Sequence, residues 1–295
     1  MNQGDLAYRI IAIIFPIFVI VIIGYIYSRK IKPDMSSGNR INMDLFTPAL
    51  IFDIMSSSNY ALSEYGHLMF GGFFVVMVSG LLAWPVAKWA GYEWKTFIPP
   101  MMFSNSGNMG VPLILLTFGE KVLPAAILLF AIENFLHFLL GQQLITQRWS
   151  IAAVFKNPMI LATIAGISFS LLSIDLPETI RFPIHMLGQV SIPLMLFSLG
   201  ARLLSIEFND WKIGAISALV CPLSGLIAAL LVMPFLDLSK EHLSILILFA
   251  ALPPAVLNYM VAEKFNQQPQ LVASIVLIGN LGSVIFIPAT LWFIL

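Results

Sequence analysis

The chain has 295 residues, of which 59% are hydrophobic and 10% charged, and its formal net charge is zero. A mean hydropathy of +0.92 excludes an ordinary soluble domain and indicates a polytopic membrane protein, because a soluble surface needs far more polar side chains. The balanced charge gives no reason to expect a nucleic-acid partner, and the single cysteine, Cys221, excludes a disulfide within the chain.

Ten apolar stretches separated by short polar loops predict an all-α membrane protein with ten transmembrane helices in the lipid bilayer. The first stretch is not followed by a small-residue cleavage pattern, so we expect it to be retained and not removed as a signal peptide. We expect one transmembrane domain over residues 1–295, with segments at 9–27, 41–58, 67–88, 97–118, 122–145, 157–174, 183–204, 212–236, 242–263 and 270–293.

Lysine and arginine are distributed unevenly over the connecting loops. The side that holds the loops after odd-numbered segments has Arg29, Lys30, Lys32, Arg40, Lys88, Lys95, Arg148, Lys156, Arg202, Lys212 and Lys264, and the other side has Arg9, Lys121, Arg181 and Lys240. The positive-inside rule therefore predicts that the odd-numbered loops lie in the cytoplasm and that both termini lie outside it, in a multi-pass protein of the cell (inner) membrane.

The fourth segment is interrupted by the string NSGNMGVP, from Asn105 to Pro112. Pro112 cannot donate a backbone hydrogen bond, so the carbonyl of Asn108 loses its helical partner, and the neighbouring glycines ease a local unwinding. Asn105, Asn108 and Pro112 are spaced i, i+3, i+7, so in a regular helix the two amide side chains and the proline lie on one face. The pattern is compatible with a site for a polar ligand and with a kinked helix whose asparagines bond neighbouring helices.

The fifth segment carries two ionisable residues well away from its ends. Glu133 and His137 are spaced i, i+4 and therefore share one face of a helix. Ionisable side chains within a membrane indicate a functional site, which here would pass or hold a proton. The alternative is a mutually satisfied structural pair.

The two halves of the chain carry matching strings, which indicates an internal repeat of about 1–147 and about 148–295. PALIF begins at Pro48 in the second segment and PLMLF at Pro193 in the seventh, while Asn134 in the fifth matches Asn280 in the tenth. A unit of five segments is odd-numbered, so the second copy enters the membrane from the opposite side. The pattern therefore predicts an inverted repeat, which is typical of secondary transporters.

The ninth segment contains the second interruption, at the place equivalent to the first. Pro253 and Pro254 free two helical carbonyls, and Asn258 and Tyr259 follow within two turns. Two half-helix N-termini that point to one place attract an anion through their dipoles and free N–H groups. The candidate substrate-binding residues are Asn105, Asn108, Pro112, Pro253, Pro254, Asn258 and Tyr259, with Asn134 and Asn280 either facing the same place or bonding neighbouring helices.

Several strings resemble those of the auxin efflux carrier family, which includes plant PIN-type carriers and bacterial organic-acid permeases. The most specific are NSGNMGVP and IPLMLFSLG, from Ile192 to Gly200, and the likeness covers nearly the whole chain. Only about a dozen residues join the two halves, as in a short bacterial-type member. The resemblance implies ten helices in two inverted five-helix repeats, helices 4 and 9 that cross at their unwound centres, a scaffold from helices 1, 2, 6 and 7, and a homodimer.

The resemblance also implies export or uptake of small organic anions. Because the two half-helix N-termini suit a carboxylate, we expect a secondary transporter, chiefly of carboxylates, that works by alternating access and needs no cofactor or metal. A sodium-coupled transporter of the bile-acid symporter type is an alternative, although the ninth segment has no carboxylate between Pro253 and Glu263 for sodium. A non-transporting membrane sensor on the same fold is another. We expect no enzyme, because the chain lacks the Gly-x-Gly-Asp and Gly-x-Ser-x-Gly strings of intramembrane proteases and hydrolases.

Overall fold

The computed structural model describes residues 3–57, 62–146, 155–204 and 210–295. All regular elements in these ranges are helices, and one isolated β-bridge joins Ser104 to Pro254. Six helices of this described part are long and apolar enough to cross a membrane, which confirms an all-helical protein with several candidate membrane spans. The six are Gly4–Ile31, Tyr65–Ala90, Glu120–Ile145, Glu178–Arg202, Trp211–Phe235 and Pro269–Ile294.

One group of helices is built around α11. In this group α1 and α3 both pack against α11, and α10 packs against α3. The group consists of α1 (Gln3–Ile31), α2 (Met35–Ile41), the π-helical turn η1 (Asn42–Phe46), α3 (Thr47–Ser57), α10 (Pro158–Leu171) and α11 (Glu178–Arg202). The carboxylate of Asp34 caps α2, and hydrogen bonds from the side chain and backbone of Ser36 lower the pKa of Asp34.

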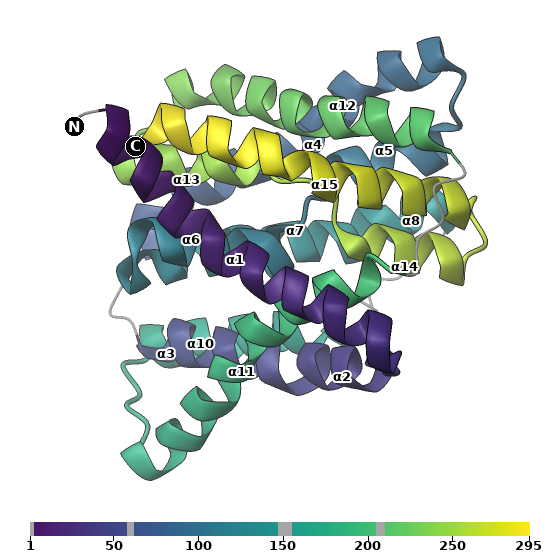
Figure 1. Cartoon of the computed structure of the whole chain (residues 1–295). Coiled ribbons are helices and arrows are strands. Elements are labelled where there is room, and N and C mark those ends of the chain that lie inside the picture. Colours follow the sequence, from purple (N-terminus) through teal and green to yellow (C-terminus); the bar gives the residue numbers. More distant parts are fainter. Residues whose placement is uncertain (1–2, 58–61, 147–154, 205–209) are drawn as a thin grey trace.

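A second group is built around α12, which packs against α4 and α15. Figure 1 shows α2, α3, α10 and α11 on one side, α4, α5, α12, α13 and α15 on the other, and α1 running obliquely across the face. The second group, around α12, consists of α4 (Leu62–Ala90), α5 (Trp94–Met102), η2 (Ser106–Gly110), α6 (Val111–Phe118), η3 (Glu120–Val122), α7 (Leu123–Leu136), η4 (His137–Gly141), α8 (Gln142–Thr146), α12 (Trp211–Val232), η5 (Met233–Phe235), α13 (Lys240–Ala250), α14 (Val256–Lys264) and α15 (Pro269–Ile294).

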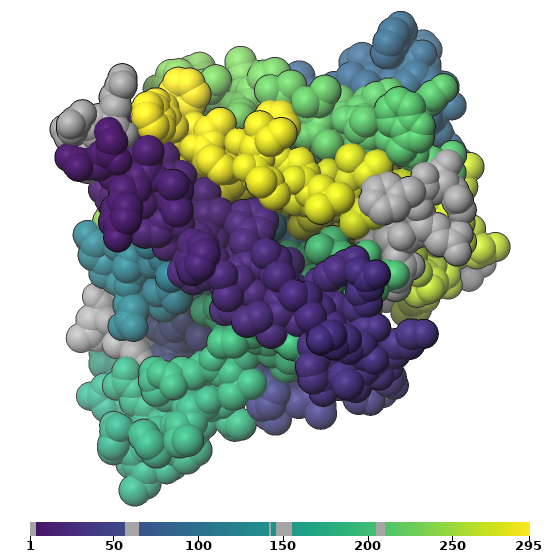
Figure 2. Space-filling model, in the orientation of Figure 1, coloured from purple at the N-terminus to yellow at the C-terminus, as the bar shows by residue number. Residues whose placement is uncertain are grey.

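Large apolar side chains are exposed along several helices, as expected of a surface that faces lipid. On α1 they include Ile11, Phe15, Ile22 and Ile26, each about half exposed or more. In Figure 2 the side chains of α1 form a diagonal band between those of α15 and those of the α10–α11 region. Exposed apolar side chains in this number suit hydrocarbon, where they avoid the unfavourable contact with water that they would make on a soluble protein.

Both interruptions expected from the sequence are present, in α5–η2–α6 and in α13–α14. The first break lies slightly upstream of its expected centre, because α5 ends at Met102 and Phe103 is extended. Helix then resumes at Ser106 as a wide π-helical turn, in which the N–H of Val111 donates to the carbonyl of Ser106. Pro112 follows at the start of α6, where a missing N–H is tolerated.

Candidate functional site

The two interruptions meet in the interior of the protein. The N–H of Asn105 donates to the carbonyl of Pro253 (2.7 Å), and the N–H of Ala255 donates to the carbonyl of Phe103 (2.9 Å). These bonds form the β-bridge between Ser104 and Pro254 and satisfy backbone groups that helix no longer pairs. Each break therefore supplies backbone partners that the other lacks.

Three of the asparagines expected at the site hold this junction together. Asn105 Nδ2 donates to Asn280 Oδ1 (2.9 Å), and Asn280 Nδ2 donates to the carbonyls of Pro254 (3.0 Å) and Val276 (2.8 Å). Asn258 Nδ2 donates to the carbonyl of Phe103 (2.9 Å). All three side chains are buried, so their amide hydrogens are largely used in bonding one helix to another.

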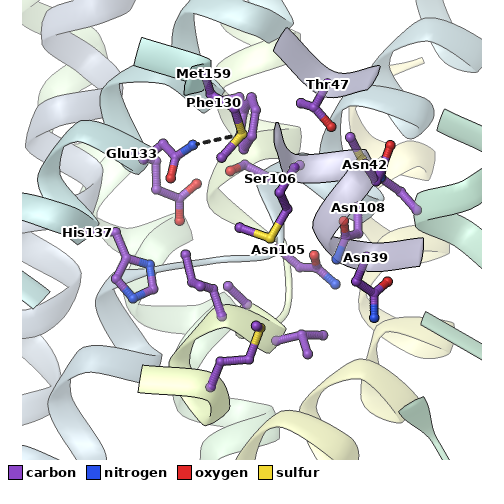
Figure 3. A pocket seen from close by; sticks show the side chains of 18 of the residues that line it. Asn39, Asn42, Thr47, Asn105, Ser106, Asn108, Phe130, Glu133, His137 and Met159 are labelled. Carbon is purple, nitrogen blue, oxygen red and sulfur yellow. Dashed lines mark hydrogen bonds between the residues drawn. The ribbon is translucent and has the colours of Figure 1, made fainter. Parts of the chain in front are cut away.

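A cavity of about 100 Å³ lies beside the junction. Figure 3 shows Asn39, Asn42 and Asn108 on one side of it and Glu133 and His137 on the other. Its polar lining consists of Asn39, Asn42, Thr47, Ser104, Asn105, Ser106, Asn108, Glu133, Asn134, His137, Ser198 and Arg202. The lining comes from both groups of helices.

Two helix N-termini border this cavity. The lining includes Ser106, Gly107 and Asn108, which begin η2, and Val256 and Leu257, which begin α14. The first N–H groups of a helix have no intrahelical acceptor and carry its positive dipole end. The cavity is therefore bordered by hydrogen-bond donors and partial positive charge from both interruptions, an arrangement that favours an anion such as a carboxylate.

The asparagines of the site do not all reach the same cavity. Asn108 lines the cavity, and among the described residues its side chain forms no hydrogen bond, so it is available to a ligand. Asn134 also lines the cavity, with Nδ2 at 3.4 Å from Met159 Sδ, a weak acceptor. Asn258 does not appear in the lining, and Asn280 lines a second cavity.

The three prolines of the expected site shape the backbone without lining either cavity. Pro112, Pro253 and Pro254 are buried at the break or at the start of the following helix. Tyr259 faces the second cavity, and its hydroxyl donates to Glu263 Oε1 (2.8 Å). These residues position the site and its approach.

Glu133 and His137 both line the first cavity, and both contact the residues that directly follow α5. The carboxylate of Glu133 accepts from the backbone N–H of Ser104 and from its hydroxyl. The ring of His137 stacks on Phe103, with centroids 4.3 Å apart and planes 15° apart. Within the described chain no hydrogen bond joins Glu133 to His137. Both side chains lie on one face of the helix and contact the residues of the first break, Ser104 and Phe103, and they do not bond each other.

A second cavity, of about 620 Å³, continues from the first. The two cavities share Asn39, Met43, Arg202, Val256 and Met260, which therefore form their junction. The larger cavity also reaches charged residues at helix ends, namely Arg40, Asp44 and Glu263.

The comparisons with known proteins agree with this architecture. A family model described as "Membrane transport protein" matches the chain twice, over residues 9–153 and 147–293. The chain belongs to this family of membrane transporters, the auxin efflux carrier family. Auxin efflux carrier component 8 of Arabidopsis thaliana is 30% identical over 142 residues. That alignment covers 46% of the present chain and 38% of the plant protein, so the chain spans well under half the length of this relative.

Arg202 is a residue of the cavity that the sequence analysis counted only among the positive charges of the connecting loops. Arg202 ends α11 and lines both cavities. Among the described residues that line the first cavity, it alone has an arginine or lysine side chain. The available signal was its spacing of i, i+4 from Ser198 and i, i+7 from Met195, which places all three on one face of α11.

Asn39 and Asn42 were also not expected at the site. Asn39 lies on α2, just before the predicted segment 41–58, and Asn42 lies on η1 at the start of that segment. Their spacing of three residues places them on one face. Neither residue stands in a string that marks a membrane site, and it is the packing of α2 and η1 against α11 that brings them to the cavity.

Proposed function

We propose that this chain is a secondary transporter that moves small organic anions, chiefly carboxylates, across the cell membrane by alternating access. The anion binds in the first cavity, between the N-terminal turns of η2 and α14 and the guanidinium of Arg202. The observation that carries the proposal is the convergence of two helix N-termini and one arginine on a cavity that continues into a larger one.

The electrostatics of this cavity favour one negative charge. The N–H groups at two helix starts supply partial positive charge, and Arg202 supplies a full one. Arg202 and Glu263 both line the second cavity, and Coulombic attraction between them favours a guanidinium near the junction of the cavities. A carboxylate that enters exchanges the attraction of Glu263 for hydrogen bonds to the guanidinium and to helix N–H groups.

Alternating access requires one part of the molecule to move relative to another. The cavity lies between the group around α11, which contributes Asn39, Asn42 and Ser198, and the breaks of the other group, which contribute Ser106 and Asn108. A shift of one group against the other would change the exposure of the anion. We further propose that the repeats are inverted, that helices 4 and 9 cross at the junction, and that the transporter is a homodimer.

Equilibrium binding of carboxylates tests this function most simply. We expect full-length protein in nanodiscs to be stabilised against thermal unfolding by at least one acid of a panel that includes acetate, propionate, succinate and benzoate. Asn108→Ala and Arg202→Gln should weaken the binding by about tenfold or more, because a hydrogen bond to a charged group contributes about 1.5–3 kcal/mol.

Asn105→Ala and Arg29→Gln serve as controls for this experiment. Asn105→Ala should lower the unfolding temperature without ligand, because it leaves Asn280 Oδ1 without its donor. Arg29 lies exposed at the end of α1, outside both cavities, and its replacement should change neither quantity. Parent-like affinity in both Asn108→Ala and Arg202→Gln would place the anion elsewhere.

A further inference from the structure

Two buried polar atoms on the α11 side of the first cavity have no hydrogen-bond partner among the described residues. They are Oδ1 of Asn42 and Oγ of Ser198, and both side chains are about 5% exposed. Leaving such a group unpaired is costly, so buried polar atoms are nearly always satisfied by protein, water or ligand. Both residues line the cavity that faces the breaks.

The hydroxyl of Ser198 departs from the usual behaviour of a serine within a helix. Serine and threonine hydroxyls in helices commonly donate to the carbonyl four residues earlier. Ser217 does so to Ile213 (2.7 Å) and Thr163 to Met159 (2.8 Å). Ser198 forms no such bond, although Arg202 lies one turn away on the same face of α11.

We propose that Asn42 and Ser198 form a hydroxyl-binding subsite beside the carboxylate site, so that the transporter prefers 2-hydroxycarboxylates to the unsubstituted acids. A ligand hydroxyl has one donor and two acceptor positions. It donates to Asn42 Oδ1 and accepts from Ser198 Oγ. This inference rests on the proposed function, since the carboxylate must lie near Arg202 for the adjacent hydroxyl to reach Ser198.

The geometry of the cavity supports this pairing of groups. η1, which carries Asn42, packs against α11, which carries Ser198 and Arg202. Further along the same interface the hydroxyls of Thr47 and Ser191 are already paired with each other (2.9 Å). Thr47 also borders the cavity, so the unpaired atoms of Asn42 and Ser198 stand beside a polar group that the protein itself satisfies.

The experiment compares lactate with propionate, which share a three-carbon chain and differ by one hydroxyl. Affinities come from ligand-dependent thermal unfolding of the full-length chain in nanodiscs, with both enantiomers of lactate. We expect the better enantiomer to bind the parent about three- to tenfold more tightly than propionate. Ser198→Ala, and separately Asn42→Ala, should bring the ratio close to one, because only lactate has a hydroxyl that loses its partner.

Ser217→Ala is the matched control. It removes a buried serine hydroxyl on α12 that lines neither cavity and already has an acceptor. We expect it to lower the unfolding temperature without ligand and to keep the lactate preference. Ser198→Ala should show the opposite pattern, with ligand-free stability unchanged or raised, because it removes an unpaired polar group.

Three results would overturn the subsite. The first is equal affinity of the parent for lactate and propionate, which would mean that water alone occupies the two polar atoms. The second is a preference for lactate that persists in both Ser198→Ala and Asn42→Ala. The third is failure of both acids to bind, and in that case binding of the larger carboxylates of the panel decides separately whether the proposed function stands.

Discussion

Asn105 and Asn108 stand three residues apart in one string, yet their side chains have different tasks. Both residues line the cavity, but Asn105 bonds the two breaks together through Asn280, whereas the side chain of Asn108 forms no hydrogen bond to a described residue. The sequence places both on the same face of a regular helix, but the extended residues before Ser106 turn the first amide toward α15. The sequence suggested two roles for intramembrane asparagine, ligand binding and bonding between helices. Asn105 has the second role, and we propose the first for Asn108.

At the same scale, Glu133 is bonded to the first break through Ser104. Its carboxylate holds the backbone and hydroxyl of Ser104. Glu133→Gln retains one carbonyl acceptor but has no charge to gain or lose. If protons drive transport through this residue, proteoliposome uptake by the variant should lose the pH dependence of the parent while ligand binding persists.

His137→Phe provides the comparison for that experiment. A phenyl ring keeps the stack on Phe103 but cannot take up a proton. An unchanged pH profile in Glu133→Gln, in protein that folds and binds, would make the carboxylate a structural partner of Ser104 and nothing more. A flat profile in both variants would assign the two residues to one coupled path.

At the scale of helices, α1 and α11 approach so closely that only glycine fits at their contact. A Cβ on Gly200 would overlap the carbonyl of Val21, and one on Gly24 would overlap the carbonyl of Phe197. We expect Gly200→Ala to cost about 1–3 kcal/mol in the free energy of unfolding, because two backbones must separate. Unfolding in detergent with a helix-sensitive probe measures this.

Gly66→Ala on α4 is the matched control, since nothing lies within 4 Å of the Cβ that it would add. It should be neutral or slightly stabilising, because alanine favours helix. If Gly200→Ala were as stable as Gly66→Ala, the two helices would be able to move apart without loss, and the close contact would not hold the α11 group together.

The elements themselves were largely predictable, and their junction was not. Apolar periodicity and length locate the long helices, and Pro112, Pro253 and Pro254 mark the interrupted stretches. The hydrogen bonds between the breaks depend on which carbonyl meets which N–H across about 150 residues of chain, and no local pattern records that register. Arg202 was likewise predicted only as one of the cytoplasmic loop charges, because no local pattern shows that the end of α11 lies beside the start of α14.

For the molecule as a whole, the distribution of charge predicts the side to which the larger cavity opens. Helix α1 begins and α15 ends at the same end of the molecule in Figure 1. The larger cavity is lined by Arg40, Arg202 and Glu263, near loops that the positive-inside rule assigns to the cytoplasm. We therefore expect an inward-facing cavity and a C-terminus outside the cytoplasm.

Reporter fusions at Leu295 test this topology. Alkaline phosphatase fused there should be active, and a fluorescent protein that matures only in the cytoplasm should stay dark. The same pair fused within the loop after α4, at Gly91, should give the reverse pattern. A bright fluorescent fusion at Leu295 with an inactive phosphatase would invert the molecule, and the cavity would then open outward.

Protection of a cysteine at position 260 tests the central claim, that a carboxylate binds between the breaks and Arg202. Met260 lines both cavities, and the native Cys221 is buried, so Met260→Cys supplies the reactive thiol in the full-length chain. The rate of alkylation by a small maleimide is measured against the concentration of the acid that binds most tightly. The account predicts that this carboxylate slows the reaction, with half-maximal protection near its dissociation constant, and that Asn108→Ala shifts the protection to higher concentration. An alkylation rate that stays constant while the same carboxylate stabilises the protein would contradict it.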